Sequence, residues 1–431
     1  MRKPGEGWRR HSIPILCAGL LAALPIGSAG AAPPAPATPG HGHDHAVVAA
    51  GRLAPSDAAD HAVRLQALLG QHSVLAADVM RSRIRGDDDF VQAAEAALGK
   101  NTDAMTDLMD RLFGEDMVGT FRPMWAEHVV ELVAYASALA ARDNTAREHA
   151  REELIEYEGE LSEFLAGLSR GRLATADAHH ALSMHVEHLT RQADAYAKGD
   201  YLTADRVNRE GYQHLYDLGL VLAETLLPAG DRSALRQPVW RLRSQLGKLL
   251  AEHVVLVEDV TRAAVTNTPD FDAAARMINA NTRDLTAAMD SLFGTAAARQ
   301  FQQLWGEHVE QLVAYSAATA KKDEAGRSKA RAALAEYEKD VAEFLSGATG
   351  ERMTRPKLFE AFAGHDEMLL KHADAYASRD YATAHDIAYQ TYEHGFDLAR
   401  QLADAFGETV AARLPRGGAQ TGYGGLVTGG R

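Results

Sequence analysis

The 431-residue chain contains a long internal duplication. The segment LFGEDMVGTFRPMWAEHVVELVAYASA begins at Leu112, and LFGTAAARQFQQLWGEHVEQLVAYSAA begins 180 residues later, at Leu292. The motif DAYAKGDY at Asp194 returns at the same offset as DAYASRDY at Asp374. Because similarity at one fixed offset indicates tandem copies of a structural unit, the chain is predicted to contain two homologous lobes.

Each lobe divides again into three similar parts. The lobes are predicted at residues 57–228 and 239–410, with a linker at 229–238. Histidines recur within each lobe every 55 to 57 residues, and an acidic turn follows each of them. These turns lie at Asp88/Asp89, Asp143, Asp200, Asp270, Asp323 and Asp380. An Asp before an Ala-rich run is typical of a helix N-cap. We therefore predict an all-α fold, in which each of the two lobes is a bundle of three long αα-hairpins with helices of about 20–25 residues.

The spacing places polar side chains at matching heights in these hairpins. Each recurring histidine lies about 15 residues before its acidic turn, and a polar partner lies 11–14 residues after the turn. Since a helix rises about 1.5 Å per residue, both lie at nearly the same level. The candidate metal ligands are His72, His128, His185, His214, His253, His308, His365 and His394. The residues predicted to orient these rings from a second layer are Asn101, Tyr157, Asn281 and Tyr337.

Two interpretations of this layer remain open. The histidines share helical faces with apolar residues, as His128 does with Trp125 and Leu132, so they are predicted to point inward. Neutral imidazole suits Zn and Cu, and three or four such ligands complete a coordination shell. The sequence therefore favours one Zn or Cu site in each lobe, used to buffer or deliver the ion. The alternative is a scaffold or binding module without metal, in which the layer is a hydrogen-bonded ladder that fixes helix register.

Signals for catalysis are lacking in the sequence. A di-iron helical bundle uses Glu-x-x-His, whereas Glu127 and His128 are adjacent, and the in-phase Glu131 becomes Gln311 in the second lobe. The chain contains one cysteine, Cys17, and neither a phosphate-binding loop nor a Gly-rich dinucleotide turn. No catalytic residue and no organic cofactor is predicted, and the protein is not expected to be an enzyme.

The two ends of the chain are predicted to lie outside the lobes. Residues 1–32 combine basic residues, an apolar run and small residues, as a signal peptide does, so we expect export to the periplasm or the extracellular space. Residues 33–56 form a Pro/Ala/His-rich disordered linker, and residues 411–431 a Gly-rich disordered tail. The linker contains accessory chelating candidates at His41, His43 and His45.

Charge and hydropathy narrow the possible partners. The formal net charge is −14 and basic residues do not cluster, so nucleic-acid binding is not expected. After the leader no apolar run reaches the roughly 18 residues of a membrane span. A metal ion is the only partner that the sequence suggests; a protein partner is not indicated.

Several segments resemble exported helical-repeat proteins of bacteria, most of unassigned function, some of which carry a copper-related label. These segments are LLGQHSVLAADV, LLAEHVVLVEDV, LWGEHVEQLVAYSAATAKKDEAGR, and AYASRDYATAH followed by YEHGFDLA. The resemblance covers both lobes; it implies the all-α fold and favours metal binding. Such proteins tend to place Met after the last histidine, whereas this chain has Leu215 and Gly395, which counts against a copper-specific site.

Overall fold

The computed structural model describes residues 55–227 and 232–413. Within them the chain forms twelve α-helices, one short 3-10 helix and no strand, so the predicted all-α fold is confirmed. Lobe one consists of α1 (Pro55–Arg85), α2 (Asp88–Phe113), α3 (Glu115–Ala141), α4 (Asn144–Leu168), α5 (Thr175–Ala197) and α6 (Tyr201–Leu226). Lobe two follows η1 (Ala234–Arg236) and consists of α7 (Pro238–Thr266), α8 (Phe271–Phe293), α9 (Thr295–Lys321), α10 (Glu324–Ala348), α11 (Arg355–Ser378) and α12 (Tyr381–Arg413).

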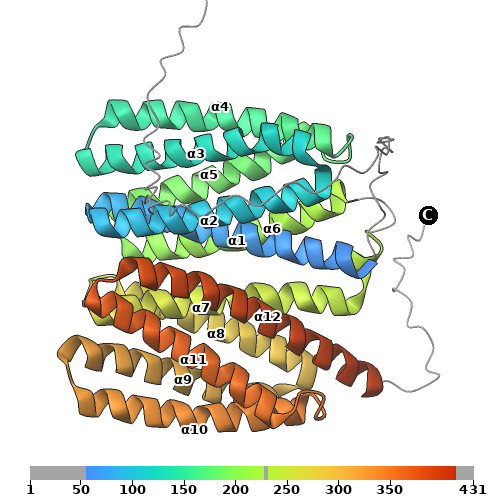
Figure 1. Ribbon diagram of the computed structural model, residues 1–431, viewed down its shortest axis with the longest axis vertical. Helices are drawn as coiled ribbons and strands as arrows, with labels where there is room; N and C mark the ends of the chain where they lie inside the picture. Colours follow the sequence, from blue (N-terminus) through green and yellow to red (C-terminus); the bar gives the residue numbers. More distant parts are fainter. Residues whose placement is uncertain (1–54, 228–231, 414–431) are drawn as a thin grey trace, which may run out of the picture. The chain divides into compact units, whose positions relative to one another are not determined.

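Consecutive helices pair into hairpins, as predicted. In lobe one these pairs are α1 with α2, α3 with α4, and α5 with α6, and lobe two repeats the arrangement from α7 to α12. Figure 1 shows the helices of lobe one, blue to green, above those of lobe two, yellow to red. Several helices exceed the predicted 20–25 residues: α1 has 31 and α12 has 33. Helix α12 thus continues to Arg413, beyond the predicted end of lobe two at 410.

Most hairpin turns are closed by an aspartate cap. The Asp143 carboxylate accepts hydrogen bonds from the backbone N–H groups of Thr145 and Ala146, both at 3.0 Å. Asp200, Asp323 and Asp380 cap α6, α10 and α12 in the same way. Each cap satisfies backbone donors that the first helical turn leaves free.

Two turns differ from the prediction. In the first, the capping residue is Asp87, which accepts from the N–H of Phe90, while Asp88 and Asp89 already belong to α2. In the fourth, Asp270 stands at the N-cap but its side chain makes no cap bond. Its carboxylate accepts from the Arg262 guanidinium at 2.6 Å instead, because a buried cation is a stronger donor than a backbone amide.

The repeated LFG sequence has a structural reason. Helix α2 ends at Phe113 and α3 begins at Glu115, so Gly114 alone reverses the chain direction. Its φ is +87°, and the equivalent Gly294 has a φ of +84°. Residues that carry a side chain rarely adopt this backbone conformation, which only glycine adopts without strain.

The histidine layer lies between two apolar regions of each lobe. In lobe one, Leu68 and Leu161 belong to a cluster on one side of the layer, and Leu75 and Leu132 to a cluster on the other. His72 lies between Leu68 and Leu75 along α1. Two further apolar clusters flank the layer of lobe two in the same way.

The two lobes pack against each other within one compact unit. The Tyr216 hydroxyl of lobe one donates to the Ser244 carbonyl at 2.9 Å, and the Tyr392 hydroxyl of lobe two donates to the Ala67 carbonyl at 2.9 Å. A Cβ on Gly247 would lie 2.8 Å from the Tyr216 oxygen, so this close approach of lobe to lobe requires glycine.

Several predictions concern segments outside the described residues. These are the leader at 1–32, the accessory histidines His41, His43 and His45, and most of the 33–56 and 411–431 segments. Of the predicted linker at 229–238, the described part contains the η1 turn and the first residue of α7.

Candidate metal centre

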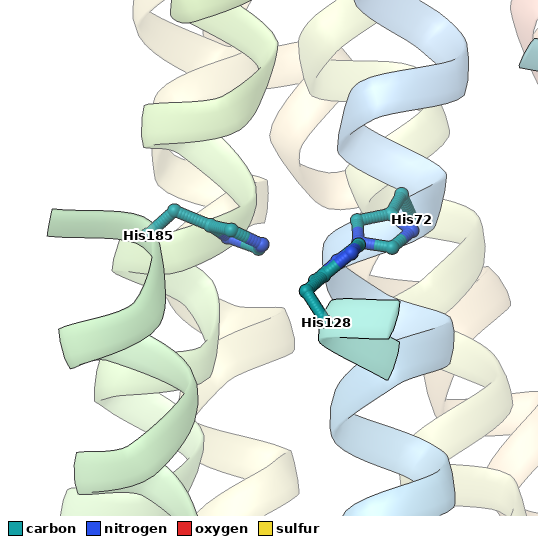
Figure 2. Close-up of side chains that lie close together, drawn as sticks. All are labelled: His72, His128 and His185. Carbon is teal, nitrogen blue, oxygen red and sulfur yellow. The ribbon is translucent and has the colours of Figure 1, made fainter. Parts of the chain in front are cut away.

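In lobe one, three histidines from three helices meet in the core. His72 lies on α1, His128 on α3 and His185 on α5. One ligand nitrogen of each ring lies within 4.8 Å of the others, and all three residues are buried. Figure 2 shows the three rings pointing toward one another, with His72 and His128 in closest approach. The Nε2 atoms of these two rings are 3.1 Å apart.

Lobe two contains a second triad with the same construction. His253 from α7, His308 from α9 and His365 from α11 each offer a nitrogen within 4.8 Å of the other two. The first helix of each hairpin therefore supplies one ring, and these three helices contact one another in both lobes. Each triad can hold a metal ion, as three of the four predicted histidines in each lobe are brought together.

The fourth histidine of each predicted set lies outside the triad. His214 Nε2 is 2.8 Å from the carbonyl oxygen of Ala181, and His394 Nε2 is 3.1 Å from that of Ala361. Both rings are half-buried, and each cross-links the two helices of the third hairpin of its lobe. Helical rise places both residues near the level of the layer, but it does not determine which way each ring turns.

Burial keeps the triad imidazoles neutral. Desolvation lowers the pKa of His128 and of His308 to about 4. Burial, and then repulsion from the neighbouring rings, lowers the pKa of His72 and His185 well below 6.5. The same causes act on His253 and His365. Near pH 7 each ring is uncharged and keeps a nitrogen lone pair, which is the form that binds metals.

Aromatic rings surround both triads. Tyr157 stacks on His128 with ring centroids 4.6 Å apart and planes 10° apart, and Tyr337 stacks on His308 at 4.7 Å and 12°. Both tyrosines were expected to orient a ring by hydrogen bonding. They contact the imidazole face instead, and the Tyr337 hydroxyl has no partner within the described part of the chain. Stacking fixes the plane of the ring, which a single hydrogen bond does not.

The two predicted asparagines anchor the helices, and Asn281 also interacts with the His253 ring, whose pKa it raises against the larger effect of burial. The Asn101 amide donates to the Leu68 carbonyl and to Gln71 Oε1, both at 3.0 Å. In lobe two, Asn281 donates to the Leu249 carbonyl at 2.9 Å and to Glu252 Oε2 at 2.8 Å. Each asparagine thus ties the two helices of the first hairpin together next to the triad histidine of that hairpin.

A tryptophan orients two of the rings in lobe two, a role that the sequence analysis did not assign. The His308 Nδ1 atom lies 3.3 Å from the Trp305 carbonyl oxygen, one helical turn earlier. A backbone acceptor at this position holds the proton on Nδ1 and leaves the lone pair on Nε2. The Trp305 indole N–H donates to His253 Nδ1 at 3.1 Å. The matching Trp125 lies 4.6 Å from the His72 ring, centroid to centroid.

An acidic residue beside the second triad was also missed. Asp366 is 1% exposed, and its Oδ1 lies 3.5 Å from His308 Nε2. Burial, and then repulsion from Glu338, raises the pKa of this carboxyl well above its usual range. Lobe one has Val186 at the matching position. The sequence signal for this residue was an Asp at a helical position where apolar residues are expected. Residues shared by both lobes do not include it, because lobe one has Val186 there.

Hydrogen bonding inside the protein does not satisfy the triads. In the described residues, every triad ring has at least one buried nitrogen without a hydrogen-bond partner, and His185 has two. A buried polar atom left in this way costs about 1–3 kcal/mol. The arrangement therefore has unused binding capacity at the centre of each lobe.

Comparisons with known proteins leave the site to be interpreted from its geometry. The chain matches no protein-family model, no curated protein and no solved structure. Among the helices described, none is long and apolar enough to cross a membrane.

Proposed function

We propose that the protein is an exported metal-binding protein that holds Zn or Cu in its two triads and buffers or delivers the ion. One observation carries the proposal: in each lobe, three buried and neutral imidazoles direct nitrogens to within 4.8 Å of one another while part of their hydrogen-bonding capacity is unused. An ion bound between the rings would give a partner to an unpaired nitrogen of His185 in lobe one, and to the unpaired Nε2 atoms of His253 and His308 in lobe two.

The dimensions of the triads support this proposal. Two nitrogens on one tetrahedral Zn²⁺ lie about 3.3 Å apart, since each Zn–N bond is about 2.0–2.1 Å. The 3.1 Å separation of His72 Nε2 and His128 Nε2, which is a hydrogen bond between the two rings in the metal-free protein, is close to this value. One nitrogen of His185 lies within 4.8 Å of a nitrogen of each of these rings. Three imidazoles also leave a fourth position of a tetrahedral ion open.

The structural alternative, a hydrogen-bond ladder, has specific support in both lobes. In lobe one, the Nε2 atoms of His72 and His128 are 3.1 Å apart and form a hydrogen bond. Because the Trp305 indole donates to His253 Nδ1, the neutral His253 ring carries its proton on Nε2. In that state His253 is a hydrogen-bond donor within the layer. Metal binding through Nε2 requires this indole bond to break and the proton to move.

Metal content of the full chain separates the two functions. The chain is purified without a histidine tag, with His41, His43 and His45 changed to Asn, and is incubated with Zn²⁺ or Cu²⁺ before gel filtration. We expect about two equivalents of bound metal, one equivalent after His128→Gln or His308→Gln, and none in the double variant. His214→Gln and His394→Gln are the matched controls, because these rings lie outside the triads, and both variants should keep two equivalents.

Binding that persists in the double variant would contradict the proposal. So would a chain that binds no metal and loses stability in both triad variants, since that pattern is expected of a ladder. Added metal should raise the melting temperature of the parent chain, because an ion that binds only the folded state stabilises it.

A further inference from the structure

Asp366 makes the two triads chemically different. It follows His365 on α11, and both of its carboxyl oxygens are buried without a hydrogen-bond partner in the described part of the protein. Lobe one has the apolar Val186 at this place, 6% exposed and packed into the core. The duplication therefore has one neutral triad and one triad with a carboxyl group beside it.

The position of Asp366 relative to His308 indicates a shared cation. The His308 Nδ1–H faces the Trp305 carbonyl oxygen, so the lone pair of His308 is on Nε2. This lone pair lies 3.5 Å from an Asp366 oxygen. A hydrogen bond between these atoms would be shorter, about 2.6–3.0 Å. Two ligands of one tetrahedral ion, with bonds of about 2.0–2.2 Å, are separated by about 3.3 Å.

We propose that Asp366 is an additional metal ligand in lobe two, which makes this triad a selective site for a divalent cation. The inference rests on the proposed function and adds the class of ion that each lobe prefers. Lobe two has a carboxyl group beside His308, which must turn toward the other two rings to join the 4.8 Å group of nitrogens, whereas lobe one offers three imidazoles alone.

Charge gives the two donor sets different preferences. A divalent ion bound by three neutral rings keeps its full charge inside an apolar core, which is costly. A bound cation would displace the proton that burial keeps on Asp366, and the resulting carboxylate would cancel one of the two charges in lobe two. Lobe one lacks this compensation, so it suits a monovalent ion such as Cu⁺ better than Zn²⁺.

Exchange of the two residues tests the inference, because each lobe provides the control for the other. In the His41/His43/His45→Asn background, Zn²⁺ affinity is measured for each lobe by competition with a chelator. The other lobe is disabled by His128→Gln or His308→Gln. We expect lobe two to bind Zn²⁺ roughly 10- to 100-fold more tightly than lobe one. Asp366→Val should remove this advantage, and Val186→Asp should confer it on lobe one.

Co²⁺ absorption gives a second measurement that does not depend on affinity. A change of donor set alters the ligand-field bands, so the bands of lobe two should move toward those of lobe one in Asp366→Val. Asp366→Asn keeps the shape of the side chain and should lose most of the Zn²⁺ advantage. Circular dichroism and melting temperature verify the fold, which Asp366→Val should retain because valine already occupies the equivalent place in lobe one.

The possible failures are distinguishable. If each triad variant removes one equivalent of metal but Asp366→Val leaves the Zn²⁺ affinity and the Co²⁺ bands of lobe two unchanged, the inference is wrong and the proposed function stands. Equal Zn²⁺ affinities of the two lobes also overturn the inference. If the triad variants do not change metal binding at all, both proposals are wrong.

Discussion

A buried histidine is costly unless its ring nitrogens have partners, and the described part of this chain buries eight, six of which form the two triads. Each ring lies on an apolar helical face and loses its contact with water. Leucine at the same positions would pack without this penalty, so the rings reduce the stability of the metal-free protein. A bound ion offsets part of this cost, because it coordinates several ring nitrogens at once.

The stability of the metal-free protein should depend on pH through these rings. The pKa of His128 and His308 is about 4 in the folded state and about 6.5 in the unfolded state. Between these values the unfolded state binds more protons, so the free energy of unfolding should fall as the pH is lowered from about 6.5 to about 4. Each ring contributes roughly 3 kcal/mol to this loss. Urea unfolding in the presence of a chelator, at a series of pH values, measures the slope.

Leucine substitutions provide the control for this pH effect. A variant with His128→Leu and His308→Leu should show a smaller slope between pH 6.5 and 4, whereas His149→Gln on the exposed surface of α4 should not change it. An unchanged slope in the double leucine variant would show that other groups cause the acid sensitivity.

Tryptophan fluorescence should report metal binding in each lobe separately. Trp125 lies beside His72 in lobe one, and Trp305 donates a hydrogen bond to His253 in lobe two. Since Cu²⁺ quenches nearby indoles, we expect strong quenching in the parent chain. Trp125→Phe should remove the lobe-one part and Trp305→Phe the lobe-two part. Equal quenching by Cu²⁺ in the Trp125→Phe/Trp305→Phe double variant would place the bound metal elsewhere.

At the scale of the helices, two glycines should respond in opposite ways to the same substitution. A Cβ on Gly219 of α6 would lie 2.7 Å from the Gln66 Cα atom of α1, so Gly219→Ala must push these helices apart. We expect a loss of about 1–3 kcal/mol in the free energy of unfolding. Gly99 of α2 has open space around it, and Gly99→Ala should instead stabilise the helix by up to about 1 kcal/mol. Thermal unfolding of both variants checks the pair, and a loss of similar size in both would contradict the close α1–α6 contact.

The helices and the layer could be predicted because they depend on regular spacing. Asp143 and Asp323 mark helix starts by local chemistry, and equal counts from each turn bring His72 and His128 to one level. The direction of the His214 ring could not be predicted, because its acceptor is a backbone carbonyl that only the packing of α5 against α6 brings near.

Differences between the lobes were harder to predict than their similarities. Comparison of the two copies emphasises shared residues, and Asp366 was passed over because lobe one has Val186 there. The Trp305 contacts depend on side-chain rotations that sequence spacing does not contain. The fold was therefore largely predictable, the composition of each triad partly so, and the groups around the triads hardly at all.

At the scale of the whole molecule, one position that differs between the two copies contributes to the contact between the lobes. Gln71 of lobe one accepts a hydrogen bond from Asn101, and Glu252 of lobe two accepts one from Asn281. Of the two matched acceptors, Gln71 is neutral and Glu252 is acidic. The Arg209 guanidinium of lobe one donates to both carboxylate oxygens of Glu252, to Oε1 at 3.1 Å and to Oε2 at 2.8 Å. Glu252 also precedes His253 in the sequence, so the contact between lobes is adjacent to the second triad.

Glu252→Gln should therefore weaken the contact between the lobes while it retains the local packing. Glutamine is the residue that lobe one already uses, and its amide oxygen can still accept from Asn281. The variant loses the charged pair with Arg209, whose remaining carboxylate partner is the half-exposed Asp284. Breaking a fully buried pair costs about 3–5 kcal/mol, and we expect about 1–3 kcal/mol here because Arg209 keeps this second partner. Urea unfolding measures the loss, with Arg206→Gln in an exposed pair on α6 as the control, which should cost less than about 1 kcal/mol. Equal effects of the two substitutions would show that the charged contact contributes nothing to holding the lobes together, and that the tyrosine hydrogen bonds and apolar packing suffice.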